Sequence, residues 1–251
     1  MADLPEAPNS SMTFAIQNIP LERLAIALIP VGVVLLILNA WSLGVRTSLT
    51  AIGRMLLQLL ILGYLLGYIF RTDISWVVIG VLTVMLVGAS WISLRVSTTG
   101  RRELLLTVLV AILLGGGSTL LIITQIVLGL DPWYAPRMMI PLAGMIFSNC
   151  MNTISLAIER FEAEISRGES GVAARRTALE AALIPITNSL LAVGLVSIPG
   201  MMTGQVLAQE DPLTAARYQI MVMCMMFGSS GLSAAICLTL IARRRTGDSD
   251  S

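Results

Sequence analysis

The sequence predicts an all-α integral membrane protein with about seven transmembrane helices, its N-terminus outside and its C-terminus in the cytoplasm. Three observations support this prediction: few charges, a series of long apolar segments and an uneven distribution of arginine. Only 12% of the 251 residues are charged and the mean hydropathy is +0.85, whereas soluble domains carry about 25% charged residues. We therefore expect much of the protein surface to contact lipid.

Seven apolar segments follow one another along the chain. They cover residues 24–43, 53–70, 75–94, 104–128, 138–158, 179–207 and 218–242. An α-helix needs about 20 apolar residues to cross the hydrocarbon core, so each segment is a predicted span. The sixth is long and contains Pro185 and Pro199, so it forms either one kinked helix or two pieces, because proline removes a backbone donor.

The distribution of arginine predicts the orientation. All 16 basic residues are arginines. Twelve lie in the odd-numbered loops with their flanks and in the C-terminal tail: Arg46, Arg54, Arg95, Arg101, Arg102, Arg160, Arg167, Arg175, Arg176, Arg243, Arg244 and Arg245. Only four lie on the other side, and positive residues accumulate on the cytoplasmic side. We expect an extracytoplasmic segment 1–23, a transmembrane domain 24–242 and a cytoplasmic tail 243–251, in a multi-pass protein of the cytoplasmic (inner) membrane.

Two missing residue types exclude several functions. Without histidine, the chain has no Ser-His or Cys-His nucleophile pair and no imidazole metal ligand. Without lysine, it has no Walker A loop. We therefore expect no catalytic residues, no bound cofactor and no metal site that can be assigned in this chain. Cys150, Cys224 and Cys237 lie in apolar stretches and are predicted to be small buried hydrophobes.

The longest internal polar segment is residues 159–178, which this topology puts in the cytoplasm. It is rich in helix formers and contains Gly168 and Gly171, so it predicts a helix, a short break and a second helix. One interpretation is a solvated connector. The other is a docking element, because a helix held off the membrane can enter a groove of a soluble partner.

Amide and hydroxyl side chains interrupt the apolar spans. Ser148, Asn149 and Asn152 lie in the fifth span and Asn188 in the sixth. Such groups are costly in hydrocarbon unless they are paired, so they either bond neighbouring helices or line a translocation path. Small residues at Gly63, Gly67 and Gly115–Ser118 predict close helix contacts or kinks.

Three stretches of the chain read GRMLLQLLILGYLLGYIF at 53–70, IPLAGMIFSN at 140–149 and ALIPITNSLLAVGLVSIPGMMTGQVLAQEDPLTAARYQIMVM at 182–223. They resemble the FetB/YbbM family of ABC-transporter permeases, whose plant relatives are linked to aluminium tolerance. Residues that match the family motifs, and that we expect to be structural, are Arg54, Gln58, Pro185, Pro199, Gly200, Met201, Met202, Asp211, Pro212, Tyr218 and Gln219. The chain departs from the family pattern at Ser148 and Gln209, which replace glycines, and at Arg217, which replaces a lysine.

The resemblance implies a permease subunit that exports iron or another metal ion. ATP and Mg²⁺ would be bound by a separate cytosolic ATPase subunit, and two permease copies would pair as a homodimer in the lipid; no nucleic acid is implied. The segment 159–178 would then be the coupling loop to the ATPase. In it, Glu162, Ala163, Glu164 and Gly168 resemble the EAA-x3-G signature of importer permeases, although Pro185 lies about one helical turn too far along.

Two other classes fit parts of the sequence. A non-transporting membrane scaffold or assembly protein would explain the spans and the polar loop, but it would not stimulate ATP turnover. A gradient-driven secondary transporter is disfavoured, because such carriers commonly place ionisable residues in mid-membrane and none lies there.

Overall fold

The computed structural model describes residues 20–69, 74–98 and 100–249, and within these ranges every regular element is a helix. The all-α prediction is therefore confirmed for this part of the chain. Most of the expected segment 1–23, and the last two residues of the tail 243–251, lie outside the described residues. The chain divides into two compact units, Met1–Gly67 and Tyr68–Ser251, which we call the N-terminal and the C-terminal unit.

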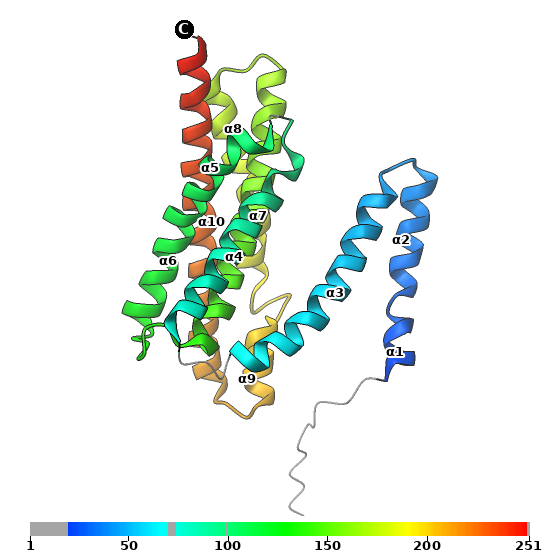
Figure 1. Cartoon of the computed structure of the whole chain (residues 1–251), viewed down its shortest axis with the longest axis vertical. Helices are drawn as coiled ribbons and strands as arrows, with labels where there is room; N and C mark the ends of the chain where they lie inside the picture. Colours follow the sequence, from blue (N-terminus) through cyan, green and yellow to red (C-terminus); the bar gives the residue numbers. More distant parts are fainter. Residues whose placement is uncertain (1–19, 70–73, 99, 250–251) are drawn as a thin grey trace, which may run out of the picture. The chain divides into compact units, whose positions relative to one another are not determined.

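The N-terminal unit contains α1 (Leu21–Ile26), α2 (Ile29–Ala40) and most of α3 (Val45–Ile69) (Figure 1). These helices correspond to the predicted spans 24–43 and 53–70. A side chain added at Gly63 or Gly67 would meet no atom within 4 Å. Within the N-terminal unit, no described atom therefore packs closely against these two glycines, where close helix contacts or kinks were expected.

The C-terminal unit is a bundle of longer helices. Its elements are α4 (Ser75–Ser93), η1 (Leu94–Val96), α5 (Arg101–Ile112), η2 (Leu113–Gly117), α6 (Ser118–Leu121), η3 (Ile122–Val127), α7 (Pro136–Ser166), α8 (Gly171–Ala192), α9 (Gly200–Leu207) and α10 (Pro212–Ser249). η1 is a 3-10 turn, whereas η2 and η3 are π-helical stretches. The predicted span 104–128 is thus a continuous helical run with two wider stretches.

Glycines allow η2 to approach α7 and α10 closely. A Cβ atom at Gly115 would lie 2.5 Å from the backbone nitrogen of Ser233, and one at Gly116 would lie 3.0 Å from Ile146 Cγ2. At Gly115 only a residue without a side chain fits so close to a backbone, whereas at Gly116 an added Cβ would require the Ile146 side chain to shift. The predicted close contact at Gly115–Ser118 is therefore confirmed at its first two residues.

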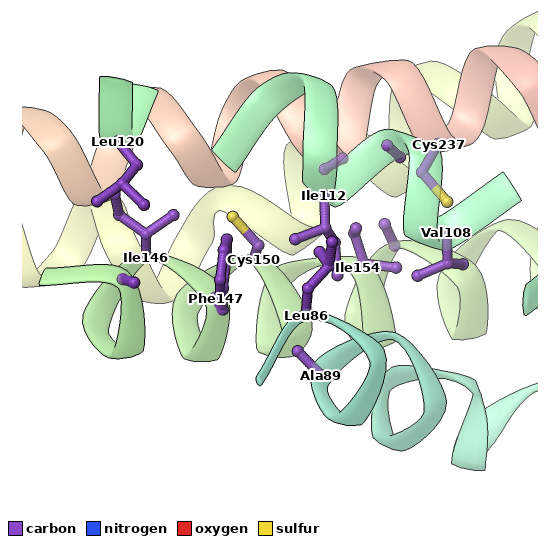
Figure 2. Packing of buried hydrophobic residues seen from close by; sticks show 14 of the residues in the cluster. Leu86, Ala89, Val108, Ile112, Leu120, Ile146, Phe147, Cys150, Ile154 and Cys237 are labelled. Atoms are coloured by element: carbon purple, nitrogen blue, oxygen red, sulfur yellow. The ribbon is translucent and has the colours of Figure 1, made fainter. Parts of the chain in front are cut away.

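The core of the C-terminal unit lies between α4, α5, α7 and α10. Figure 2 shows Leu86, Ile112, Ile154 and Cys237 among the side chains that meet there. Cys150 and Cys237 are buried, as predicted, but Cys224 is exposed. The reason is helical phase: Val222, Met223 and Met225 are buried on α10, and successive side chains of a helix point about 100° apart.

The predicted sixth span, 179–207, consists of two helices. α8 begins at Gly171 and ends at Ala192, and Pro185 lies within it without ending it. The chain then turns through residues 193–199, where Gly194 has φ +81° and donates its N–H to the carbonyl of Ser197 at 3.0 Å. Pro199 precedes α9 as its N-cap residue, so of the two prolines only Pro199 marks a helix boundary.

Six helical stretches among the described residues are long and apolar enough to cross a membrane. They are Glu22–Ala40, Val45–Leu65, Ser75–Val96, Arg101–Val127, Pro136–Ser166 and Pro212–Arg244. α8 is not one of them, because Arg175, Arg176 and Glu180 lie in its first ten residues. The structure therefore has six such helices where the sequence predicted about seven spans.

Candidate functional site: the α7–α8 hairpin

α7 is longer than a bilayer crossing requires. Its 31 residues extend over about 46 Å at 1.5 Å per residue, and a hydrocarbon core is roughly 30 Å thick. About ten residues of the helix therefore emerge from the core. Apart from Arg137 at its start, the charged residues of α7 all lie at or after Glu159, so the emerging end is the C-terminal one, which leads into α8.

The turn between α7 and α8 stops one helix and starts the next within four residues. Gly168 has φ +89° and its N–H donates to Ile165, while the N–H of Glu169 donates to the carbonyl of Glu164 at 3.2 Å. This is the Schellman pattern, in which a residue of positive φ closes a helix. Ser170 then caps α8 by accepting a hydrogen bond from the N–H of Ala173 at 3.3 Å. The predicted order of helix, short break and helix is confirmed.

Glu162 binds a segment that lies far away in the sequence. Its Oε1 accepts a hydrogen bond from Ser97 Oγ at 2.6 Å, and its Oε2 accepts bonds from the N–H and the hydroxyl of Thr98 at 2.8 and 2.7 Å. Hydrogen bonds to a charged acceptor contribute about 1.5–3 kcal/mol each when buried, and less when exposed. The carboxylate predicted to face a partner is thus engaged with the segment that follows α4.

Glu164 forms ion pairs with two arginines near the C-terminal end of its own helix, α7. Its side chain is about 10% exposed and Oε1 accepts from Arg160 at 2.7 Å and from Arg167 at 2.9 Å. The two arginines are 40% and 62% exposed, so water screens both ion pairs and each contributes little. Ala163 is half-buried beside it. Of the four predicted coupling residues, only Gly168 is exposed.

The exposed surface of the hairpin is the turn itself together with the first residues of α8. Residues 166–170 are exposed, and the side chain of Val172 is 71% exposed. An apolar side chain that stands out among polar ones is a candidate contact for a partner. The sequence analysis missed Val172, because a single valine in a polar segment gives no signal until its exposure is known.

The candidate path residues lie on the exposed side of the hairpin. Ser148, Asn152 and Asn188 are exposed and Asn149 is half-buried. Ser148 and Asn149 donate to the carbonyl of Met145 in their own helix. Among the described residues, none of the four forms a hydrogen bond to another helix, so the first interpretation, bonding between neighbouring helices of this chain, has no support.

Ser148 and Asn188 lie at the same depth. Ser148 comes 18 residues before the end of α7, and Asn188 comes 17 residues after the start of α8. In an antiparallel pair of helices this difference is about 1.5 Å along the axis. Asn152 shares a face of α7 with Ser148, because residues four apart are neighbours on a helix. The hairpin therefore carries three exposed polar side chains at similar depth, Ser148, Asn152 and Asn188, which we call the amide patch.

The motif residues fall into four places, one of which is Pro185 within α8. Arg54 and Gln58 are exposed on α3. Pro199 caps α9, whose first residues Gly200, Met201 and Met202 follow it. Asp211, Pro212, Tyr218 and Gln219 begin α10: the carboxylate of Asp211 accepts from the N–H of Thr214 at 2.9 Å, and Gln219 is buried with no hydrogen-bond partner for Oε1 among the described residues. In the part of the chain that the structure describes, no group of three or more His, Cys, Asp or Glu residues could hold a metal ion.

These features define a multi-pass membrane protein in which the end of α7 and the start of α8 form a polar helical hairpin. The chain belongs to the uncharacterised protein family UPF0014, whose model matches residues 21–245. It is 33% identical over 243 residues to the probable iron export permease protein FetB of Escherichia coli, which covers 90% of this chain and 92% of that protein. The family resemblance drawn from the sequence motifs is therefore confirmed.

Two further relatives extend the comparison. The UPF0014 membrane protein slr1647 of Synechocystis is 34% identical over 207 residues, covering 76% of this chain and 80% of that protein. Protein ALUMINUM SENSITIVE 3 of Arabidopsis thaliana is 28% identical over 200 residues, covering 73% and 71%. No solved structure matches the chain.

Proposed function

We propose that this chain is the permease subunit of an ABC transporter of the cytoplasmic (inner) membrane. It exports iron or another metal ion, using ATP hydrolysed by a separate cytosolic subunit. The observation that carries the proposal is the similarity to the probable iron export permease FetB over 90% of the chain. The chain itself supplies the membrane path and a surface for the ATPase, and ATP and Mg²⁺ are bound by the partner.

The topology that we propose has seven crossings, with the N-terminus outside. The C-terminal ends of α7 and α10 both bond the segment around the start of α5: Glu162 to Ser97 and Thr98, and Arg244 Nη1 to the carbonyl of Glu103 at 2.8 Å. The two helices therefore run in the same direction, and the chain between them must return across the membrane. α8, the turn and α9 supply that return as a broken crossing, which transporters commonly use.

The arginines support the cytoplasmic assignment of this end. It carries Arg95, Arg101 and Arg102 before and within α5, and Arg167 and Arg176 in the hairpin. The other end of the C-terminal unit has Arg137 and Arg217. Since positive residues accumulate in the cytoplasm, the hairpin turn and the C-terminus face the compartment that holds the ATPase.

The translocation path that we propose runs along the amide patch. An exposed asparagine in hydrocarbon is costly, so the patch needs water, substrate or another protein beside it. A second permease copy satisfies this requirement, because an amide both donates and accepts and can therefore pair with its own symmetry mate. The path would then lie between two copies, lined by Ser148, Asn149, Asn152 and Asn188.

The first experiment tests the coupling surface. The tagged chain is purified in mild detergent, and the ATPase activity of co-purifying subunits is measured with and without ferrous iron. Val172→Asp is expected to remove at least about 90% of the bound ATPase, because a charge in an apolar contact is left unpaired. Leu213→Asp is the matched control, since Leu213 is 63% exposed at the start of α10, at the opposite end of the bundle.

The outcomes separate the candidate classes. A stoichiometric ATPase that Val172→Asp removes and Leu213→Asp keeps supports the ABC permease, and stimulation by ferrous iron supports the metal substrate. A chain that never carries an ATPase, under conditions where a known permease retains its own, contradicts the proposal and favours a membrane scaffold.

A second experiment tests the path. Asn152→Leu is expected to abolish metal resistance in cells while the protein level and the bound ATPase stay unchanged, because only the polar lining is lost. Thr83→Val is the control: Thr83 is also exposed, but on α4, and its hydroxyl bonds Ile79 of its own helix at 2.8 Å. Unchanged resistance in Asn152→Leu would remove this residue from the path.

A further inference from the structure

The carboxylate of Glu162 joins two segments that are separated by more than 60 residues. Three donors from Ser97 and Thr98 converge on its two oxygens at 2.6–2.8 Å. One of these donors is a backbone N–H, so the bond fixes the main chain as well as a side chain. The segment that follows α4 is thereby held at the end of α7, next to the hairpin turn.

Further contacts hold the neighbourhood of that segment. The guanidinium of Arg101 on α5 lies 5.8 Å from the centre of the Trp91 ring on α4. This cation–π contact joins the two helices. Arg244 at the end of α10 donates to the carbonyl of Glu103. Figure 1 shows the α7–α8 turn and the C-terminal end of α10 at the same end of the C-terminal unit. Three helix ends therefore support one surface.

The surface around this segment is basic. Exposed arginines are Arg95, Arg101, Arg102, Arg167, Arg176, Arg243 and Arg244. The exposed acids of the same region are fewer: Glu103, Glu159, Glu169 and Glu180. A basic surface favours an acidic partner through electrostatic complementarity. A fluid lipid headgroup layer would also attract arginines, but it does not require a backbone held in one conformation by a carboxylate.

We propose that Glu162 is a positioning residue that clamps segment 94–98 to α7, so that this segment and the α7–α8 turn form one composite docking surface. The occupant is the acidic face of the ATPase subunit, and this inference rests on the proposed function. Val172 supplies the apolar contact of the surface and Arg95 a charged one. Glu162 acts by holding segment 94–98 in place and does not itself touch the partner.

The clamp is tested without any partner. Hydrogen exchange of the amides in segment 94–98 is followed in the full chain in nanodiscs. Glu162→Ala is expected to speed exchange by at least about tenfold, because three hydrogen bonds to a carboxylate are lost. Glu162→Gln keeps an acceptor oxygen and is expected to give an intermediate rate. Glu159→Ala, which removes an exposed acid of the same helix, is the control and should change nothing; equal rates in all variants would overturn the clamp.

The docking role is tested by photo-crosslinking in the complex purified with its ATP-hydrolysing subunit. A benzophenone amino acid replaces Arg95 in one variant and Val172 in another. Both are expected to cross-link to that subunit, and adding Glu162→Ala should remove at least about 90% of the Arg95 cross-link while the Val172 cross-link persists. Thr98→Val, which removes one bond and keeps the backbone donor, should weaken the Arg95 cross-link only in part.

The outcomes distinguish the two proposals. If position 172 cross-links to the ATPase and position 95 cross-links only to lipid, the composite surface is wrong although the proposed function stands. If the Arg95 cross-link survives Glu162→Ala unchanged, Glu162 is not the positioning residue. If neither position cross-links to an ATPase, the proposed function and the docking surface fail together, while the exchange experiment still decides on the clamp.

Discussion

The α7–α8 turn and the α9–α10 turn have the same construction, at opposite ends of the bundle. Each contains four residues, 167–170 and 208–211. In both, the N–H two residues past the C-cap donates to the carbonyl five residues earlier: Glu169 to Glu164, and Glu210 to Gln205 at 3.0 Å. In both, the fourth residue caps the next helix, Ser170 for α8 and Asp211 for α10.

The turns differ in the residue of positive φ and in what surrounds it. Gly168 has φ +89°, whereas Gln209 has φ +65°, a conformation that costs an L-residue about 1–2 kcal/mol. The family motif has glycine at position 209. Next to the first turn, Glu162 bonds segment 97–98, and Glu164 pairs with Arg167 of the turn itself. The comparison teaches that the turn type is set by local chemistry, while its rigidity depends on residues outside the turn.

Stability can be followed through the cysteines. Cys150 and Cys237 are buried and Cys224 is exposed, so in a Cys224→Ser background a maleimide dye reacts only after unfolding. For a chain of this size, 1 kcal/mol corresponds to a shift in Tm of about 2–4 °C. This assay serves the three predictions that follow.

The largest effect is expected at the glycine of the first turn. Gly168→Val should lower stability by about 1–3 kcal/mol, because a β-branched residue is strained at positive φ. A Cβ there would meet no atom within 4 Å, so the cost comes from the backbone alone. Gly171→Ala, also in open space but at ordinary φ, is the control. An equal loss in both variants would contradict the role of φ.

A smaller effect is expected from the caps. Asp211→Ala should cost about 1 kcal/mol, because Asp211 accepts bonds from both the N–H and the hydroxyl of Thr214 at 2.9 and 3.1 Å. Ser170→Ala should cost less, since its bond to Ala173 is longer, at 3.3 Å. The difference in Tm between the two variants measures the difference in stability that the two capping residues contribute. A larger fall in Tm for Ser170→Ala than for Asp211→Ala would refute this ranking.

The smallest expected effect is a gain in stability. Gln209→Gly should raise stability by a few tenths to about 1 kcal/mol, since the relief of the left-handed strain exceeds the larger entropy of glycine in the unfolded chain. The measurement is the same thiol-based Tm. Gln205→Gly, within α9, is the control and should destabilise, because glycine is unfavourable inside a helix. A fall in Tm for Gln209→Gly would show that the glutamine side chain makes a contact that outweighs the strain.

Much of the hairpin could be predicted from the sequence, because its signals are local. Gly168 and Gly171 predicted a break between two helices, because glycine is typical of a helix end. In the structure the turn occupies residues 167–170 between them. The sixth span was harder to predict, because Pro185 and Pro199 gave equal grounds for a boundary. Only Pro199 became one, since the chain turns where Gly194 adopts φ +81°.

The roles of the polar residues on α7 could not be predicted in the same way. The sequence showed that Glu162 and Glu164 were polar, but not that the first would bond Thr98 and the second Arg160 and Arg167. It also gave no indication that Ser148 and Asn152 would be exposed while Cys150, between them, is buried. These outcomes depend on the direction each side chain takes around the helix and on which neighbour lies there.

By itself the sequence determined the membrane class, the positions of the apolar helices and the chemistry of the turns. These are one-dimensional properties: hydrocarbon thickness sets the length of an apolar run, and φ preferences act on single residues. Only the tertiary structure decided which carboxylates are engaged, which amides are left exposed and which glycines meet a neighbouring backbone. The physical reason is that hydrogen bonds and close packing join residues such as Glu162 and Ser97, or Gly115 and Ser233, whose distance in sequence carries no information about their distance in space.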